Sequence, residues 1–302
     1  MQTANGRSAA MTLDRIFHPT DFTEASEIAF VHALKLAAHT HGRLTMLHNE
    51  SHEHIQHWSE YPKVRNVLER WGFLPPHSQR EDVAQLGLSI AKIAAREATP
   101  VEGALDYLQR HPHDLIVLAT HQYAGLARLT HPAVAEPLVR KAGEMALFVP
   151  EGADGFVAIE SGAVTLHNIL IPVDHLPAPQ MALEAASVIA AALNCNRVRF
   201  TVLHVGDASA FPQVHVPARE AVGWHKVVKS GNVEAAILET AHECKADLIV
   251  MATAGRHGVV DALRGSTTER IVRNAEVPVL AVPAGEQVQE LLDPSLTWQP
   301  IG

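Results

Sequence analysis

The chain has 302 residues, of which 47% are hydrophobic and 19% are charged, and its formal net charge is −9 at pH 7. This balance suits the packed cores of two ordinary domains and argues against disorder outside the ends. The negative charge argues against nucleic acid and anionic membranes as general partners. No apolar run reaches about 18 residues, and the polar N-terminus lacks the apolar core of a signal peptide, so a cytoplasmic protein is expected.

Residues 13–150 form the first predicted domain, which opens with the strand segment Arg15–Asp21. Between its second and third strands this domain carries 23 residues more than the second half, because the offset between the halves falls from 156 (204 − 48) to 133 (247 − 114). The extra segment predicts a helical insertion near 50–90, acting as a structural lid and ended by Pro75-Pro76. Its apolar face comprises Trp58, Val64, Val67, Leu68 and Trp71.

The same insertion contains a histidine cluster that could suggest a metal site. On a helix, His54 and His57 share a face, whereas His52 lies well around it. The spacing matches no established zinc signature. No metal site is therefore predicted.

A short connection, residues 151–166, joins the two halves. Two apolar runs, Phe156–Ile159 and Ala163–Leu166, flank Glu160-Ser-Gly162. This pattern predicts a hairpin-like linker more than a loose one. Residues 1–12 and 285–302 are interpreted as tails.

The second predicted domain, residues 167–284, alternates apolar strands with amphipathic helices. Continuous apolar strands of this kind indicate a parallel sheet that is covered on both faces. The expected strands are Ile169–Val173, Phe200–Val205, Lys226–Lys229, Leu248–Thr253 and Val277–Val282, and the expected helices are Met181–Leu193, Glu234–Cys244 and Thr267–Asn274.

The two halves are copies of one pattern. Asp114-Leu-Ile-Val-Leu-Ala-Thr120 and Asp247-Leu-Ile-Val-Met-Ala-Thr253 lie 133 residues apart (247 − 114), and the segments ending at Asp21 and Asp174 lie 153 apart (174 − 21). A period this long indicates two complete domains rather than a solenoid. We therefore expect an α/β protein of two tandem, doubly wound parallel sheets. The last strands, Met145–Val149 and Val277–Val282, are exposed apolar edges and should pair, packing the domains as a pseudo-dimer; further homodimerisation stays open.

The segment after the strand 248–253 has the features of a phosphate loop. Glycines and small residues separate this strand from Ser266-Thr-Thr-Glu269, a capping-box pattern that opens a helix. Free backbone amides at a helix N-terminus bind anions, and glycine lets a phosphate approach closely.

This segment resembles the universal stress proteins, whose nucleotide-binding members carry G-x2-G-x9-G-[ST] after the fourth strand. Gly255 and Gly265-Ser266 fit in register, whereas Ala252 stands at the first glycine. The resemblance implies an adenine-nucleotide α-hydrolase-like fold and bound ATP, with Mg²⁺ or Mn²⁺ possible beside it. It also implies an aspartate at the adenine and ribose, a valine facing adenine, and a residue beside the base. The predicted nucleotide-binding residues are Asp174, Val205, Met251, Ala252, Gly255, Arg256, His257, Gly258, Gly265, Ser266 and Thr267.

The first half keeps the aspartate, Asp21, but lacks this loop. Gly255, Gly265 and Ser266 become Gln122, Pro132 and Ala133 at the 133 offset. Proline removes a backbone donor, and glutamine adds a side chain where the backbone must approach a phosphate. ATP is therefore expected only in the second domain.

The sequence offers no nucleophile with an adjacent base, no Walker lysine and no acid pair. The expected function is that of a stress-responsive regulator without efficient catalysis and with an unknown protein partner. Two alternatives remain open: an interaction scaffold without nucleotide, and a slow ATPase or autophosphorylating protein modified at Ser266 or Thr267.

Overall fold

The computed structural model describes residues 11–50, 60–120, 135–216, 223–254 and 267–284. The first half contains β1 (Arg15–Pro19), α1 (Glu24–Thr40), β2 (Arg43–Asn49), α2 (Val64–Arg70), α3 (Arg80–Gln85), β3 (Ser89–Ala95), α4 (Pro100–Arg110), β4 (Leu115–Thr120), α6 (Ala135–Ala142) and β5 (Met145–Pro150). The second half contains β6 (Asn168–Pro172), α7 (Gln180–Ala192), β7 (Arg199–Val205), the 3₁₀ turn η1 (Ala208–Ala210), β8 (Gly223–Lys229), α8 (Val233–Glu243), β9 (Leu248–Thr253), α9 (Thr267–Asn274) and β10 (Val279–Pro283).

The strands form one ten-stranded sheet in the order β3-β2-β1-β4-β5-β10-β9-β6-β7-β8. All neighbouring pairs are parallel except β5 and β10, which run antiparallel with Leu147 opposite Leu280. These are the two strands that the sequence predicted to pair. The order within the second half mirrors the order within the first, and the α/β fold with its parallel sheets is confirmed.

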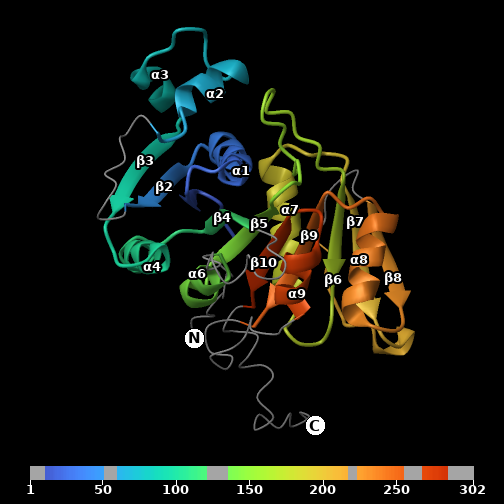
Figure 1. Cartoon of the computed structure of the whole chain (residues 1–302). Coiled ribbons are helices and arrows are strands. Elements are labelled where there is room, and N and C mark those ends of the chain that lie inside the picture. The colour runs from blue at the N-terminus through green and yellow to red at the C-terminus, as the bar shows by residue number, and fades with distance from the viewer. Residues whose placement is uncertain (1–10, 51–59, 121–134, 217–222, 255–266, 285–302) are drawn as a thin grey trace, which may run out of the picture.

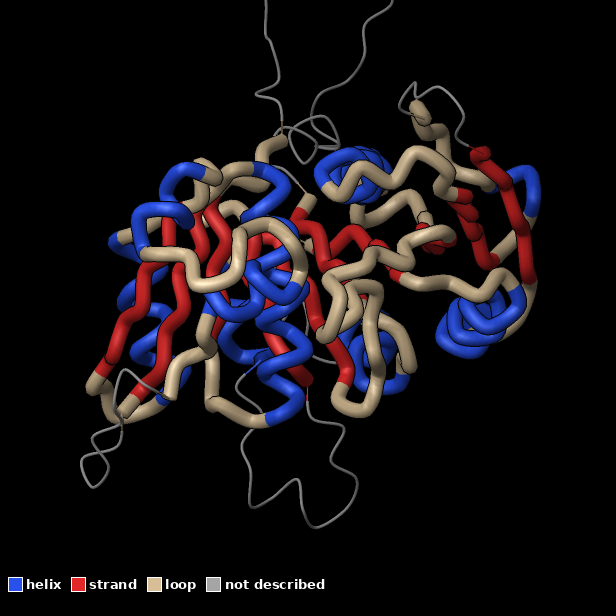
Figure 2. The backbone as a smooth tube through the Cα atoms, turned by 90° about the horizontal axis from the view of Figure 1, so that it is seen from above, coloured by secondary structure: helices blue, strands red, loops and turns tan. Residues whose placement is uncertain are grey.

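Helices cover both faces of this sheet (Figures 1 and 2). One face packs against α1 and α7 through a core that includes Phe30, Leu34 and Leu183. The opposite face packs against α4, α6, α8 and α9, where Leu108 and Ile271 belong to a second core. Because both faces are covered, strands such as Leu248–Thr253 are apolar at nearly every position.

The described part of the insertion forms the short helices α2 and α3, and α3 lies beyond Pro75-Pro76, where the helical part was predicted to end. Helix α2 ends at Arg70, five residues before Pro75, because Gly72 adopts a φ of 75°. The amides of Gly72 and Phe73 donate to the carbonyls of Glu69 and Leu68, which closes the helix in a Schellman motif. Residues 51–59, including Trp58 and the histidines His52, His54 and His57, lie outside the described part of the chain.

The described part of the insertion contacts α1, where the Lys35 ammonium lies over the rings of Trp71 and Phe73, and it also contacts the segment between the halves. The Trp71 side chain donates from Nε1 to the carbonyl of Ile159 at 2.9 Å. Gly162 lies so close that a Cβ there would stand 2.5 Å from the Trp71 ring, and its φ of 64° also favours glycine. Val157 and Val164 of this connecting segment form an antiparallel bridge.

Candidate functional site

The second half brings the carboxyl ends of three parallel strands to one edge of the sheet. Strand β6 lies between β9 and β7, and the chain runs outward through β7 and β8 before returning to β9. The gap between β6 and β9 is therefore the topological switch point, where open α/β sheets bind ligands. The amide of Val173 donates to the carbonyl of Leu203 at 2.8 Å, so the β6 end is fixed against β7.

Asp174 follows β6 at this edge, and its side chain is exposed. Its Oδ1 accepts a hydrogen bond from the amide of His175 at 2.7 Å. A carboxylate oxygen has further lone pairs, so Asp174 keeps acceptor capacity for a ligand.

The neighbouring strands place three more predicted residues at the same edge. Val205 is half-buried at the end of β7, and β9 carries the buried Met251 and the half-buried Ala252. Thr267 begins α9 and accepts a hydrogen bond at its hydroxyl from Arg270 at 3.2 Å. The other predicted binding residues lie outside the described part of the chain: Gly255, Arg256, His257, Gly258, Gly265 and Ser266.

Two loops beside this edge are tied together by hydrogen bonds. His175 Nε2 lies 3.0 Å from the carbonyl oxygen of Ala210. Gln180 donates to the carbonyl of His215 and accepts from its amide, each at 3.0 Å. The hydroxyl and amide of Ser209 donate to Asp207, which holds the pKa of that carboxyl below its usual value. These hydrogen bonds therefore connect the segment that follows β6 to the segment that follows β7.

His204 is a site feature that the sequence analysis did not single out. It is 4% exposed, and its Nδ1 lies 3.2 Å from the carbonyl oxygen of Val173. Its Nε2 has no hydrogen-bond partner among the described residues, although buried polar atoms are normally paired. The ring meets Phe211 edge-on, with centroids 5.8 Å apart. The internal repeat could have pointed to His204, because His48 stands at the corresponding position of the first half.

The corresponding edge of the first half is arranged differently. Asp21 accepts two hydrogen bonds through Oδ1, from the amide and the hydroxyl of Thr23. Phe22 stacks on His48 with centroids 4.3 Å apart and meets Tyr61 edge-on at 5.1 Å. Phe22 stands at the position of His175, so this half carries an aromatic cluster where the second half has a loop contact. Residues 122–133, the counterpart of the phosphate loop, lie outside the described ranges.

Within the described ranges, no three His, Cys, Asp or Glu side chains gather in a way that could hold a metal ion. Among the helices that the structure describes, none combines the length and the apolar character needed to cross a membrane.

Comparisons with known proteins place this geometry in context. The model of the universal stress protein family matches residues 12–150 and 215–283. A universal stress protein of Methanocaldococcus jannaschii is 52% identical over 46 residues, which is 15% of this chain and 27% of that protein. Universal stress protein A homolog 2 of Coxiella burnetii is 41% identical over 58 residues, or 19% of this chain and 39% of that protein. The chain thus matches well under two thirds of either relative's length.

Two solved structures share the fold over nearly the whole chain. A universal stress protein from Archaeoglobus fulgidus has a TM-score of 0.59 at 18% identity, covering 90% of this chain and 97% of its own. A functionally unknown protein from Pseudomonas aeruginosa PAO1 has a TM-score of 0.61 at 17% identity, covering 93% and 96%. At these identities the similarity concerns the fold alone.

Proposed function

Because this chain belongs to the universal stress protein family, we propose that its second half binds ATP and that its first half binds none. The observation that carries the proposal is the placement of three predicted residues on three adjacent parallel strands at the switch point of the second half. Asp174 lies two residues beyond β6, Val205 is the last residue of β7, and Met251 lies two residues before the end of β9. Parallel sheets place ligand sites at such an edge. The identity of the ligand as ATP is inferred from the resemblance to the nucleotide-binding members of the family.

Each described residue has a role in this proposal. The Asp174 carboxylate accepts hydrogen bonds from the adenine and ribose side of ATP, and the backbone of Val205 faces the base. Met251 lies beside the base. The amides of the loop between β9 and α9, with Ser266, bind the phosphates together with the N-terminus of α9. Mg²⁺ or Mn²⁺ would accompany the phosphates and neutralise part of their charge.

The proposed role is a cytoplasmic, stress-responsive regulator that changes its interactions with a protein partner when ATP is bound. The described part of the site contains no nucleophile paired with a base, so efficient catalysis has no support in it. Bound ATP stabilises the conformation that holds it, and this stabilisation grows with ATP concentration. The population of the ATP-bound conformation would therefore report the ATP concentration.

Mass spectrometry of the ligand released from the purified protein tests the proposal first. Adenine nucleotide at close to one equivalent per chain is expected. Gly265→Val places side-chain volume against the phosphates and should abolish ATP binding with an unchanged circular dichroism spectrum. Pro132→Val, the matched change in the first half, should leave ATP binding intact. Absence of nucleotide, together with no ATP binding by the unchanged protein, would instead favour the scaffold.

A further inference from the structure

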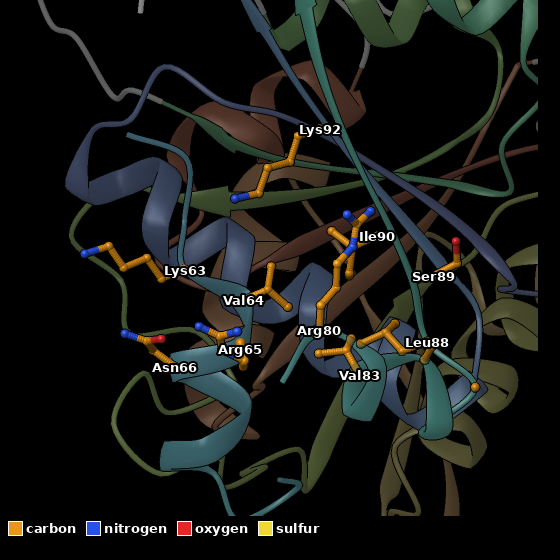
Figure 3. Close-up of a pocket in the computed structure, with 12 residues that line it drawn as sticks. Lys63, Val64, Arg65, Asn66, Arg80, Val83, Leu88, Ser89, Ile90 and Lys92 are labelled. Atoms are coloured by element: carbon orange, nitrogen blue, oxygen red, sulfur yellow. The ribbon is translucent and has the colours of Figure 1, made fainter. Parts of the chain in front are cut away.

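A cationic cavity lies between the insertion and the edge strand of the first half. Residues of α2, α3, β3 and their flanking turns line this cavity, which is open to solvent and has a volume of about 1050 Å³ (Figure 3). Four basic side chains line it: Lys63, Arg65, Arg80 and Lys92. None of the described residues that line it is acidic. Figure 1 places α2 and α3 on the first half, apart from strands β6, β7 and β9.

The charges of this cavity are poorly neutralised by the protein. Among described residues, Lys63 and Arg80 make no ion pair, and Arg65 is 4.0 Å from Glu69. Glu69 itself accepts two hydrogen bonds from Ser78, through the amide at 3.0 Å and the hydroxyl at 2.6 Å. The Lys92 ammonium lies 5.5 Å from the centre of the Tyr61 ring. Burial lowers the pKa of Lys92, and an anion beside it would favour the charged ammonium.

The floor of the same cavity is apolar. Ile90 and Lys92 are two residues apart on β3 and therefore share one face of the strand. Val83 of α3 is half-buried beside them, and Leu88 is buried. The cavity thus offers an apolar surface to the hydrocarbon part of a ligand and basic side chains to an anionic group of the same ligand.

We propose that this cavity binds a small amphipathic organic anion, a carboxylate with an aliphatic body such as a medium-chain fatty acid. The aliphatic body would lie on Val83, Leu88 and Ile90, and the carboxylate would pair with Arg80 and Lys92. The volume is sufficient for a ligand of this size. A chain of net charge −9 repels anions in general, so binding here depends on the local cluster of cations. This site is separate from the proposed ATP site and does not depend on it.

Calorimetric titration with sodium decanoate below its micelle concentration tests the proposal. One saturable site per chain is expected, and ATP at saturation should leave the affinity unchanged. Arg80→Gln combined with Lys92→Gln should weaken decanoate at least about tenfold, because charge-assisted hydrogen bonds to the carboxylate are lost. Arg80→Gln alone and Val83→Ser, both on the solvent-facing helix α3, should each weaken it several-fold.

The controls separate this site from general adsorption. Arg110→Gln removes an exposed cation of α4 outside the cavity and should leave binding unchanged. Acetate has the carboxylate without the long aliphatic chain, and decanol has the chain without the carboxylate. Each should bind much more weakly than decanoate. No saturable decanoate binding, decanol binding as tightly as decanoate, or equal loss in Arg110→Gln would each overturn the proposal. Competition by ATP would assign the anion to the other site and overturn it too.

Discussion

His32 fixes the segment between the two halves to helix α1, and replacing it with leucine should destabilise the protein. The ring is fully buried, and its Nε2 accepts hydrogen bonds from the amides of Phe156 at 2.9 Å and Val157 at 3.2 Å. Nδ1 donates to the carbonyl of Ile28 at 2.7 Å. Leucine fills a similar volume but offers no acceptor, so two buried amides lose their partners. At about 1–3 kcal/mol each, the free energy of unfolding should fall by about 2–6 kcal/mol.

Urea denaturation followed by tryptophan fluorescence measures this loss. Trp71 is a suitable reporter because it donates to Ile159 of the same segment. Hydrogen exchange at the Phe156 and Val157 amides locates the change, and both should exchange faster. His242→Leu, an exposed histidine of α8, is the matched control and should leave stability unchanged. An unaltered urea midpoint with unaltered amide protection in His32→Leu would refute the reasoning.

The same histidine makes stability depend on pH. Burial lowers the pKa of His32 to about 4 from 6.5, although the bond to Ile28 acts in the opposite direction. The unfolded chain therefore binds more protons between these values. The contribution is complete above pH 6.5 and is lost as the pH falls toward 4, a change of roughly 3 kcal/mol. The pKa values of His18, His39 and His113 are lowered as well, that of His18 to about 4, so the variant should lose only the His32 part of the total pH dependence. Identical slopes in parent and His32→Leu would contradict the assignment.

Asp174→Ala should weaken ATP by roughly 10- to 150-fold, since hydrogen bonds to a charged group contribute about 1.5–3 kcal/mol, whereas Asp21→Ala should leave ATP binding unchanged. Equal losses in a fluorescence titration would show that the first half also binds a base or a ribose. Trp71→Ala should lower the melting temperature clearly, because it removes a half-buried ring and its bond to Ile159, worth about 2–4 kcal/mol together. By contrast, changing His52, His54 and His57 of the insertion to alanine should hardly affect the melting temperature. Stoichiometric zinc in the purified parent protein that is missing from this triple variant would contradict the prediction that the insertion holds no metal site.

The sequence predicted the order of elements well where strands are buried on both faces. Leu248–Thr253 was predicted with the bounds that the structure has, because its apolar run is continuous. The edge strand β8 begins three residues earlier than predicted, at Gly223, since its exposed positions interrupt the apolar pattern. Strand β10 begins later than predicted, at Val279, after the proline at 278. Helix α3 was missed because the two prolines were interpreted as the end of the insertion's helical part.

The order of elements predicts that Asp174, Val205 and Met251 lie toward one carboxyl edge of the parallel sheet. The structure places them on or just after β6, β7 and β9, and their role in binding stays a prediction. The environment of His204, whose Nε2 has no hydrogen-bond partner in the described part of the chain, depends on packing that residue spacing does not predict. The lining of the cationic cavity includes Arg80 of α3 and Lys92 of β3, and only the folded insertion places these separate elements around one cavity.

Calorimetric titration of ATP into protein stripped of nucleotide tests the central claim most directly. The account predicts one equivalent of ATP per chain, bound in the second half and abolished by Gly265→Val. Two equivalents would show that the first half also binds ATP and would contradict the asymmetry. No binding at all would contradict the proposed function itself.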